Sequence, residues 1–251
     1  QPVDAVAPAA AAEPPPAASM QFVLWAALLS GAMTLAYEIA WLRLMAVYTL
    51  NSVYVFTMVV TVFLAALAIG SGLAARVQRR GGWSPAHWVT AVQLAVALLS
   101  PLTLALVPAA AELRLDLPGR SESSIFLREY ALAGLLVFVP TVLLGMTLPL
   151  LVGMCGASSS RTGATVGRVY AWNSVGTILG SALTGAVMVP LVGLRGTLLA
   201  LSACGLLLAT MAACTAGAPR LRSAPAFAAC GVVLLVALVP GATRFFRPSY
   251  N

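Results

Sequence analysis

The sequence predicts an all-α fold, a polytopic bundle of transmembrane helices with about seven spans. Hydrophobic residues make up 61% of the chain, charged residues only 8%, and the mean hydropathy is +0.96. Soluble domains carry about 25% charged residues. The apolar residues gather in segments near the roughly 20 residues that a helix needs to cross a bilayer. The alternating pattern of a transmembrane β-barrel is missing from these segments, so helices are expected.

The chain divides into an arm, a membrane domain and a tail. Residues 1–21 form an Ala/Pro-rich arm that we expect to be extended. Because the arm lacks a basic n-region, it does not resemble a signal peptide. A protein partner or the chain's own loops would hold it in place. The transmembrane domain covers 22–242 and the tail 243–251. The expected spans are 22–48, 53–75, 87–110, 130–154, 167–190, 193–214 and 225–242.

The arginines predict the orientation of the helices in the membrane. Arg79 and Arg80 follow the second segment, which places that loop and the N-terminus in the cytoplasm. This orientation fits a multi-pass protein of the bacterial inner membrane. Seven spans would put Arg244 and Arg247 outside, against the positive-inside rule. Either the seventh segment is re-entrant, or the charge bias is overruled there.

Composition also excludes several classes of protein. The net charge of +7 comes from arginines that lie mostly in loops or at helix ends, so nucleic acid is not an expected partner. The chain has four cysteines without a CxxC pair and one histidine, so no metal site or cofactor is expected. It contains no P-loop, no GxGxxG motif and no Ser/His/Asp set. We therefore expect no catalytic residues in this chain.

Glu38 is the residue that most needs an explanation. It follows Tyr37 inside the first apolar segment, where an ionisable side chain costs at least about 2.5–3.5 kcal/mol. Arg43 lies five residues further along the same helix, about 140° around its axis, and is therefore a poor partner.

Polar residues of other segments are better candidates to contact Glu38. They are Asn173, Tyr170, Gln93 and Thr61. With Glu38 and its neighbours Tyr37 and Arg43, the first three form the candidate intramembrane polar site. Two interpretations stay open. Glu38 either belongs to an intramembrane cation or proton site, or forms half of a hydrogen-bonded clamp between helices.

Small residues and prolines mark two further features. Gly176 and Gly180 form a GxxxG pair that Ser181 and Gly185 continue, a pattern typical of close helix packing and also compatible with sliding helices. Such glycine-rich faces, like the N-terminal arm, are candidate contacts for protein partners.

Pro140 and Pro149 interrupt the fourth segment. Each proline frees a backbone carbonyl. Kinked helices line binding sites in many transporters, but neighbouring groups also re-satisfy such carbonyls where nothing binds.

Four stretches together resemble the membrane domain of spermidine synthase-like bacterial membrane proteins, also called fused transporter/spermidine synthase proteins. They lie within 30–43, 52–72, 144–150 and 167–196, and include the strings YEIAWLR, LGMTLPL, GRVYAWNSVG and PLVGLRG. In that family a soluble aminopropyltransferase-like domain usually follows the last helix. The 251 residues contain no such domain, so the resemblance implies only the membrane half.

These observations lead to two hypotheses about function. The first is a transporter-like or channelling membrane domain in which Glu38 attracts a small cation such as a polyamine or a proton. The second is a non-catalytic structural or accessory subunit of a larger membrane complex. A membrane anchor for a separate synthase domain is a third interpretation.

Overall fold

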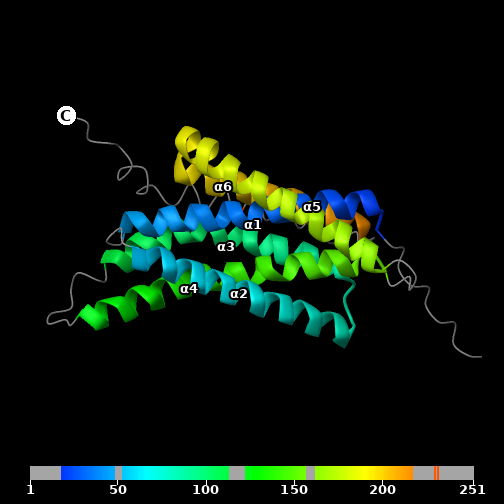
Figure 1. The fold of residues 1–251 in the computed structure, drawn as a ribbon, viewed down its shortest axis with the longest axis horizontal. Coiled ribbons are helices and arrows are strands. Elements are labelled where there is room, and N and C mark those ends of the chain that lie inside the picture. Colours follow the sequence, from blue (N-terminus) through cyan, green and yellow to red (C-terminus); the bar gives the residue numbers. More distant parts are fainter. Residues whose placement is uncertain are drawn as a thin grey trace, which may run out of the picture.

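The computed structural model describes residues 18–48, 53–112, 122–156 and 162–216, together with Ala229 and Gly231. These residues contain helices and no strand, so the predicted all-α fold is confirmed for them. Figure 1 shows the helices lying side by side along the long axis. They are α1 (Met20–Tyr48), α2 (Val53–Arg80), α3 (Pro85–Glu112), α4 (Glu122–Gly153), α5 (Thr162–Leu183), the π-helical turn η1 (Thr184–Met188) and α6 (Val189–Thr215).

Local sequence explains where several helices begin and end. The Ser19 hydroxyl accepts a hydrogen bond from the Phe22 amide at the start of α1. The Ser84 hydroxyl does the same for His87 at the start of α3. Serine is a favoured N-cap because it satisfies a free backbone N–H. The turn between α2 and α3 contains Gly81, whose φ of 70° only glycine adopts easily.

Four helical stretches are long and apolar enough to cross a membrane: Met20–Ala46, Phe56–Arg80, Pro85–Leu104 and Gly163–Thr215. Val137–Gly153 is a shorter apolar helix. The structure therefore supports a membrane protein, whereas seven spans are not confirmed. The predicted segment 225–242 lies outside the described residues except for Ala229 and Gly231. The arm lies outside them up to residue 17, and the tail lies wholly outside.

The longest apolar stretch, Gly163–Thr215, is bent rather than straight. Gly193 has φ 70° and ψ 176°, which are not helical angles, so the helical run is interrupted there. Gly176 faces the Leu28 carbonyl, and Gly180 faces Ala32. Because residue numbers rise together in these pairs, α5 runs parallel to α1.

Contacts with α3 give the direction of α6. Hydrogen bonds join Tyr37 to Ser100 and Trp41 to Thr103, so α3 runs parallel to α1. Thr90 of α3 bonds the Ala209 carbonyl, and further along α3 Ser100 bonds Ser202. Residue numbers fall along α6 as they rise along α3, so α6 is antiparallel to both α3 and α1. The chain thus reverses direction between α5 and α6, near Gly193 (Figure 1).

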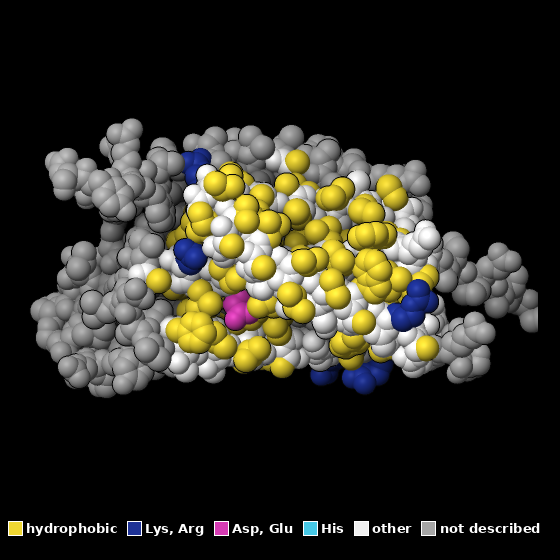
Figure 2. Space-filling model, turned by 45° about the horizontal axis from the view of Figure 1, so that its top comes forward, with side chains coloured by type: hydrophobic (Ala, Val, Ile, Leu, Met, Phe, Trp, Pro, Cys, Tyr) yellow, Lys and Arg dark blue, Asp and Glu magenta, His cyan; other side chains and the backbone are white. Residues whose placement is uncertain are grey.

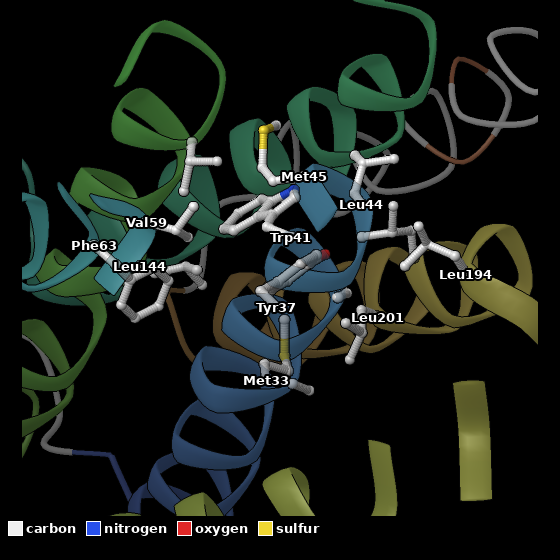
Figure 3. Packing of buried hydrophobic residues seen from close by; sticks show 14 of the residues in the cluster. Met33, Tyr37, Trp41, Leu44, Met45, Val59, Phe63, Leu144, Leu194 and Leu201 are labelled. Atoms are coloured by element: carbon white, nitrogen blue, oxygen red, sulfur yellow. The ribbon is translucent and has the colours of Figure 1, made fainter. Parts of the chain in front are cut away.

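The core is built around aromatic residues of α1. Tyr37 and Trp41 are fully buried and stack with their ring centroids 5.0 Å apart. Phe63 of α2 packs near Trp41, at a centroid distance of 6.5 Å. Figure 3 shows these rings together with apolar side chains of α4 and α6. The interior therefore joins α1 to helices from both halves of the chain.

Large apolar side chains also cover the outside of the bundle. Ile178 is 67% exposed and Leu191 77% exposed. In the face of the molecule that Figure 2 shows, hydrophobic side chains cover much of the described surface. An exposed apolar surface of this extent is consistent with contact to lipid.

Candidate functional site

Glu38 lies half-buried on α1 and has no partner among the described residues. It is the only acidic residue whose side chain the structure describes. It makes no hydrogen bond or ion pair within the described part of the chain. Figure 2 shows acidic atoms at the surface with hydrophobic side chains around them. A carboxyl group in such surroundings can gain much from a cation or a hydrogen-bond partner.

The polar residues expected to contact Glu38 lie elsewhere. The Asn173 carbonyl and side-chain oxygen approach Gly31, about 10 Å along α1 from Glu38. Tyr170 is 50% exposed on α5. Gln93 and Thr61 form hydrogen bonds with other residues: Thr147 and the Thr57 carbonyl. Within the described residues, the structure therefore offers no hydrogen-bonded clamp for Glu38.

The GxxxG pair of α5 forms the contact with α1. A Cβ atom on Gly176 would meet the Leu28 carbonyl, and one on Gly180 would meet the Ala32 backbone. The two backbones therefore approach as closely as glycine allows. Ser181 instead bonds the Ile178 carbonyl of its own helix, and Gly185 has open space within the described structure. Of the three glycines, Gly176 and Gly180 therefore pack against the α1 backbone, whereas the Cβ position of Gly185 meets nothing.

The turn η1 explains the position of Arg43. The Val189 amide donates to the Thr184 carbonyl, five residues back, which defines a π-helical turn. The next bond in this register would join residue 190 to Gly185, but Pro190 has no N–H. Arg43 Nη2 lies 3.5 Å from the Gly185 carbonyl oxygen and donates to it instead. Arg43 of α1 thus donates a hydrogen bond to the Gly185 carbonyl, for which Pro190 cannot supply a backbone N–H.

The contacts between α1 and α5 bracket the height of Glu38 relative to η1. The pairs Leu28–Gly176 and Ala32–Gly180 share an offset of 148 residues between α1 and α5. This offset places Glu38 beside Ala186 of η1, whereas the Gly31–Asn173 pair, with an offset of 142, places it beside Gly180, before η1. Arg43 and Glu38 are not paired, as their spacing predicted. Among the described contacts, Arg43 is therefore the residue that joins α1 to this irregular turn.

The two prolines of the fourth segment do not break the helix. Both lie inside α4, which continues as a helix through them. Pro149 cannot donate to the Gly145 carbonyl, and the Ser71 hydroxyl of α2 donates to that carbonyl at 3.2 Å. Gln78 Nε2 donates to the Pro149 carbonyl at 3.3 Å. Side chains of α2 therefore donate hydrogen bonds to the backbone carbonyls of α4 near Pro149. These carbonyls are not left free to bind a solute.

A hydrogen-bonded set of polar side chains lies inside the bundle. The Tyr37 hydroxyl lies 3.0 Å from Ser100 Oγ, which lies 2.9 Å from Ser202 Oγ. Trp41 Nε1 donates to Thr103 Oγ1 at 3.3 Å. These five side chains come from α1, α3 and α6, and all are buried.

Sequence reasoning missed most of this set. Tyr37 was a candidate because it precedes Glu38, but its side chain points into the core and Glu38 does not. The signal that could have found the set is the spacing of polar residues on α3. Thr90, Gln93, Ser100 and Thr103 recur at helical intervals of three and seven, which places them on one face.

Metal chemistry has no candidate site here. In the ranges that the structure describes, no three His, Cys, Asp or Glu residues come together as a metal-binding group would require. No protein-family model, curated protein or solved structure matches this chain. The interpretation of function therefore depends on the geometry of the bundle.

Proposed function

We propose that this chain is a transporter-like or channelling integral membrane protein that binds a small cationic solute at Glu38. The observation that carries the proposal is a half-buried carboxyl group with no partner among the described residues. A charged carboxylate costs several kcal/mol in lipid unless a cation compensates it. A cationic solute at the α1–α5 seam would provide that compensation.

The resemblance to the membrane half of spermidine synthase-like proteins favours a polyamine as the solute. A polyamine carries ammonium groups that can both pair with the carboxylate and donate hydrogen bonds to it. In this proposal the Gly185 carbonyl of η1, which Arg43 contacts at 3.5 Å, would be a second acceptor for N–H groups of the solute. In this proposal Arg43 faces the same seam and limits how many positive charges can enter.

Labelling with a hydrophobic carbodiimide, which reacts with carboxyl groups in apolar surroundings, tests the site. In proteoliposomes, we expect Glu38 to be modified, and spermidine to slow the modification in a concentration-dependent way. The Glu38→Gln variant should lose the label at this position. Labelling at Glu38 that spermidine leaves unchanged would argue against a cationic solute there.

Uptake separates binding from transport. Proteoliposomes with the natural sequence should accumulate radiolabelled spermidine, and Glu38→Gln should abolish this accumulation while Glu38→Asp retains part of it. If binding is seen without uptake, channelling or an accessory role replaces transport.

A second candidate function is an accessory subunit of a membrane complex. It is favoured by the partly exposed position of Glu38, where a basic residue of a partner helix could reach it. A photo-cross-linker at Ile39, the next residue on α1, should then capture a protein partner in native membranes, and Glu38→Gln should abolish the capture. Spermidine would not compete in that case.

We also propose an orientation in which the start of α1 faces the cytoplasm. α1, α3 and α5 run in one direction and α6 in the opposite one, which fits a chain that crosses the membrane once with each of the helices α1 to α6. Arg79, Arg80 and Arg168 then share the cytoplasmic end, because α2 ends there and α5 begins there. The ring pairs Trp25–Trp172 and Trp83–Trp88 lie at that end as well. Labelling of single cysteines in intact cells tests this orientation.

A further inference from the structure

The end of α2 carries three arginines on one face of the helix. Arg76, Arg79 and Arg80 are all exposed, and within the described residues they form no hydrogen bond or ion pair. At about 100° per residue, Arg76 lies between the other two around the axis, and all three fall within an arc of about 100°. Their side chains therefore start from one narrow strip of α2, within about 6 Å along its axis.

The same strip of α2 is apolar and exposed directly before the arginines. Ile69 is 47% and Leu73 40% exposed, and both lie within about 60° of Arg76 around the axis. A Cβ atom on Gly72, also on this strip, would meet nothing within 4 Å in the described structure. Gln78, which donates a hydrogen bond to α4, lies on the opposite face of the helix. In Figure 1 the last turns of α2 lie at the edge of the bundle, so the strip faces away from the other helices.

An exposed tryptophan follows the arginines in the turn to α3. Trp83 is 59% exposed, although its ring packs against Trp88 with a centroid distance of 5.1 Å. Gly81 and Gly82, both with positive φ, form the turn that leads to it. Tryptophan is enriched where the acyl chains of a bilayer meet the headgroups. Trp83 therefore marks the level of the headgroups at this end of α2.

We propose that this strip binds an anionic phospholipid, with the phosphate on the three arginines and the acyl chains along Ile69 and Leu73. A guanidinium group donates two parallel N–H bonds to a phosphate, whereas the ammonium group of a zwitterionic headgroup would be repelled by the arginines. The helix dipole favours Arg79 and Arg80 in the last turn of α2. It does not explain Arg76, which lies before that turn, or the exposed apolar surface on the same strip.

Lipid binding to the full chain, measured by native mass spectrometry from a neutral detergent, tests the site. Each arginine near an anionic headgroup strengthens binding about fivefold, so phosphatidylglycerol should bind on the order of 100-fold more tightly than phosphatidylcholine with the same acyl chains. The triple variant Arg76→Gln/Arg79→Gln/Arg80→Gln should lose this preference. Replacement of the same arginines by lysine should retain part of it, because lysine keeps the charge but not the planar pair of donors.

Single variants locate the site and protect the test against misfolding of the triple variant. Arg79→Gln should reduce the preference about fivefold. Arg168→Gln, which changes an exposed arginine of α5, is the matched control and should leave most of the preference in place. Millimolar inorganic phosphate should not displace the lipid, because it lacks acyl chains. The proposal is overturned if the natural protein binds both lipids equally, if Arg79→Gln and Arg168→Gln have the same effect, or if inorganic phosphate displaces the lipid.

Discussion

The Ser71 hydroxyl of α2 donates to the Gly145 carbonyl of α4, with 3.2 Å between the two oxygens. This carbonyl is the one that Pro149 leaves without a helical partner, because a proline at the fourth position beyond it has no N–H. α2 and α4 also approach closely here, since a Cβ on Gly145 would touch the Leu67 backbone. A proline defect in one helix and a serine in its neighbour thus act as a matched pair.

Replacing Ser71 should therefore destabilise the protein only while Pro149 is present. We expect Ser71→Ala to lower the free energy of unfolding by about 1 kcal/mol, the scale of hydrogen bonds between membrane helices. In a Pro149→Ala background the helix makes its own bond to Gly145, so the same change should cost much less. Unfolding in mixed micelles, followed by circular dichroism, measures both values. Equal costs in the two backgrounds would contradict the pairing.

Glycines of α5 should differ sharply in their tolerance of a methyl group. Gly176→Ala would drive a Cβ into the Leu28 carbonyl, so the helices must separate, at an expected cost of about 1–3 kcal/mol. Gly185→Ala is the matched control, because its Cβ would meet open space in the described structure. We expect the control to be neutral or slightly stabilising. The unfolding midpoints of the two variants in micelles measure this difference. A similar loss of stability in both variants would disprove the close α1–α5 contact.

The tyrosines of α1 and α5 provide a third comparison. Tyr37→Phe removes a buried hydroxyl that lies 3.0 Å from Ser100 Oγ and should cost about 0.5–1.5 kcal/mol. Tyr170→Phe removes an exposed hydroxyl and should change the stability by less than about 0.5 kcal/mol. Thermal unfolding of the two variants tests the difference. A larger loss at Tyr170 would show that the polar interior contributes little to stability.

Cys155 should react slowly with maleimide near neutral pH. It follows the end of α4, and burial raises the pKa of its thiol. The reactive species is the thiolate, so the labelling rate should rise about tenfold per pH unit from pH 7 to 9. The measurement uses a variant in which Cys204, Cys214 and Cys230 are replaced by alanine. An ordinary thiol would level off near pH 8.5, as we expect after unfolding in detergent, so a plateau below pH 9 in the folded protein would contradict the burial.

Much of the fold could be predicted from the sequence because membrane helices follow from composition. The apolar segments 22–48 and 53–75 correspond closely to α1 and α2. Gly176 and Gly180 were recognisable as a packing pair from their spacing alone. Pro140 and Pro149 lie inside α4, which continues as a helix through both, and the expected kinks at these residues stay a prediction. The sequence shows that a carbonyl is freed, but not that Ser71 lies opposite it.

The sequence also predicted one part of the candidate site and missed another. The sequence by itself determined that Glu38 is an ionisable group in an apolar helix and that Arg43 is not its partner, because both follow from the geometry of a single helix. Only the tertiary structure decided that Asn173 lies beside Gly31, that Arg43 bonds the Gly185 carbonyl, and that Gln93 faces Thr147. These pairings depend on the rotation and height of one helix against another. Hydropathy contains little information about either the rotation or the height, because an apolar helix in lipid is stable in many orientations. A few small residues and hydrogen bonds select one of these orientations.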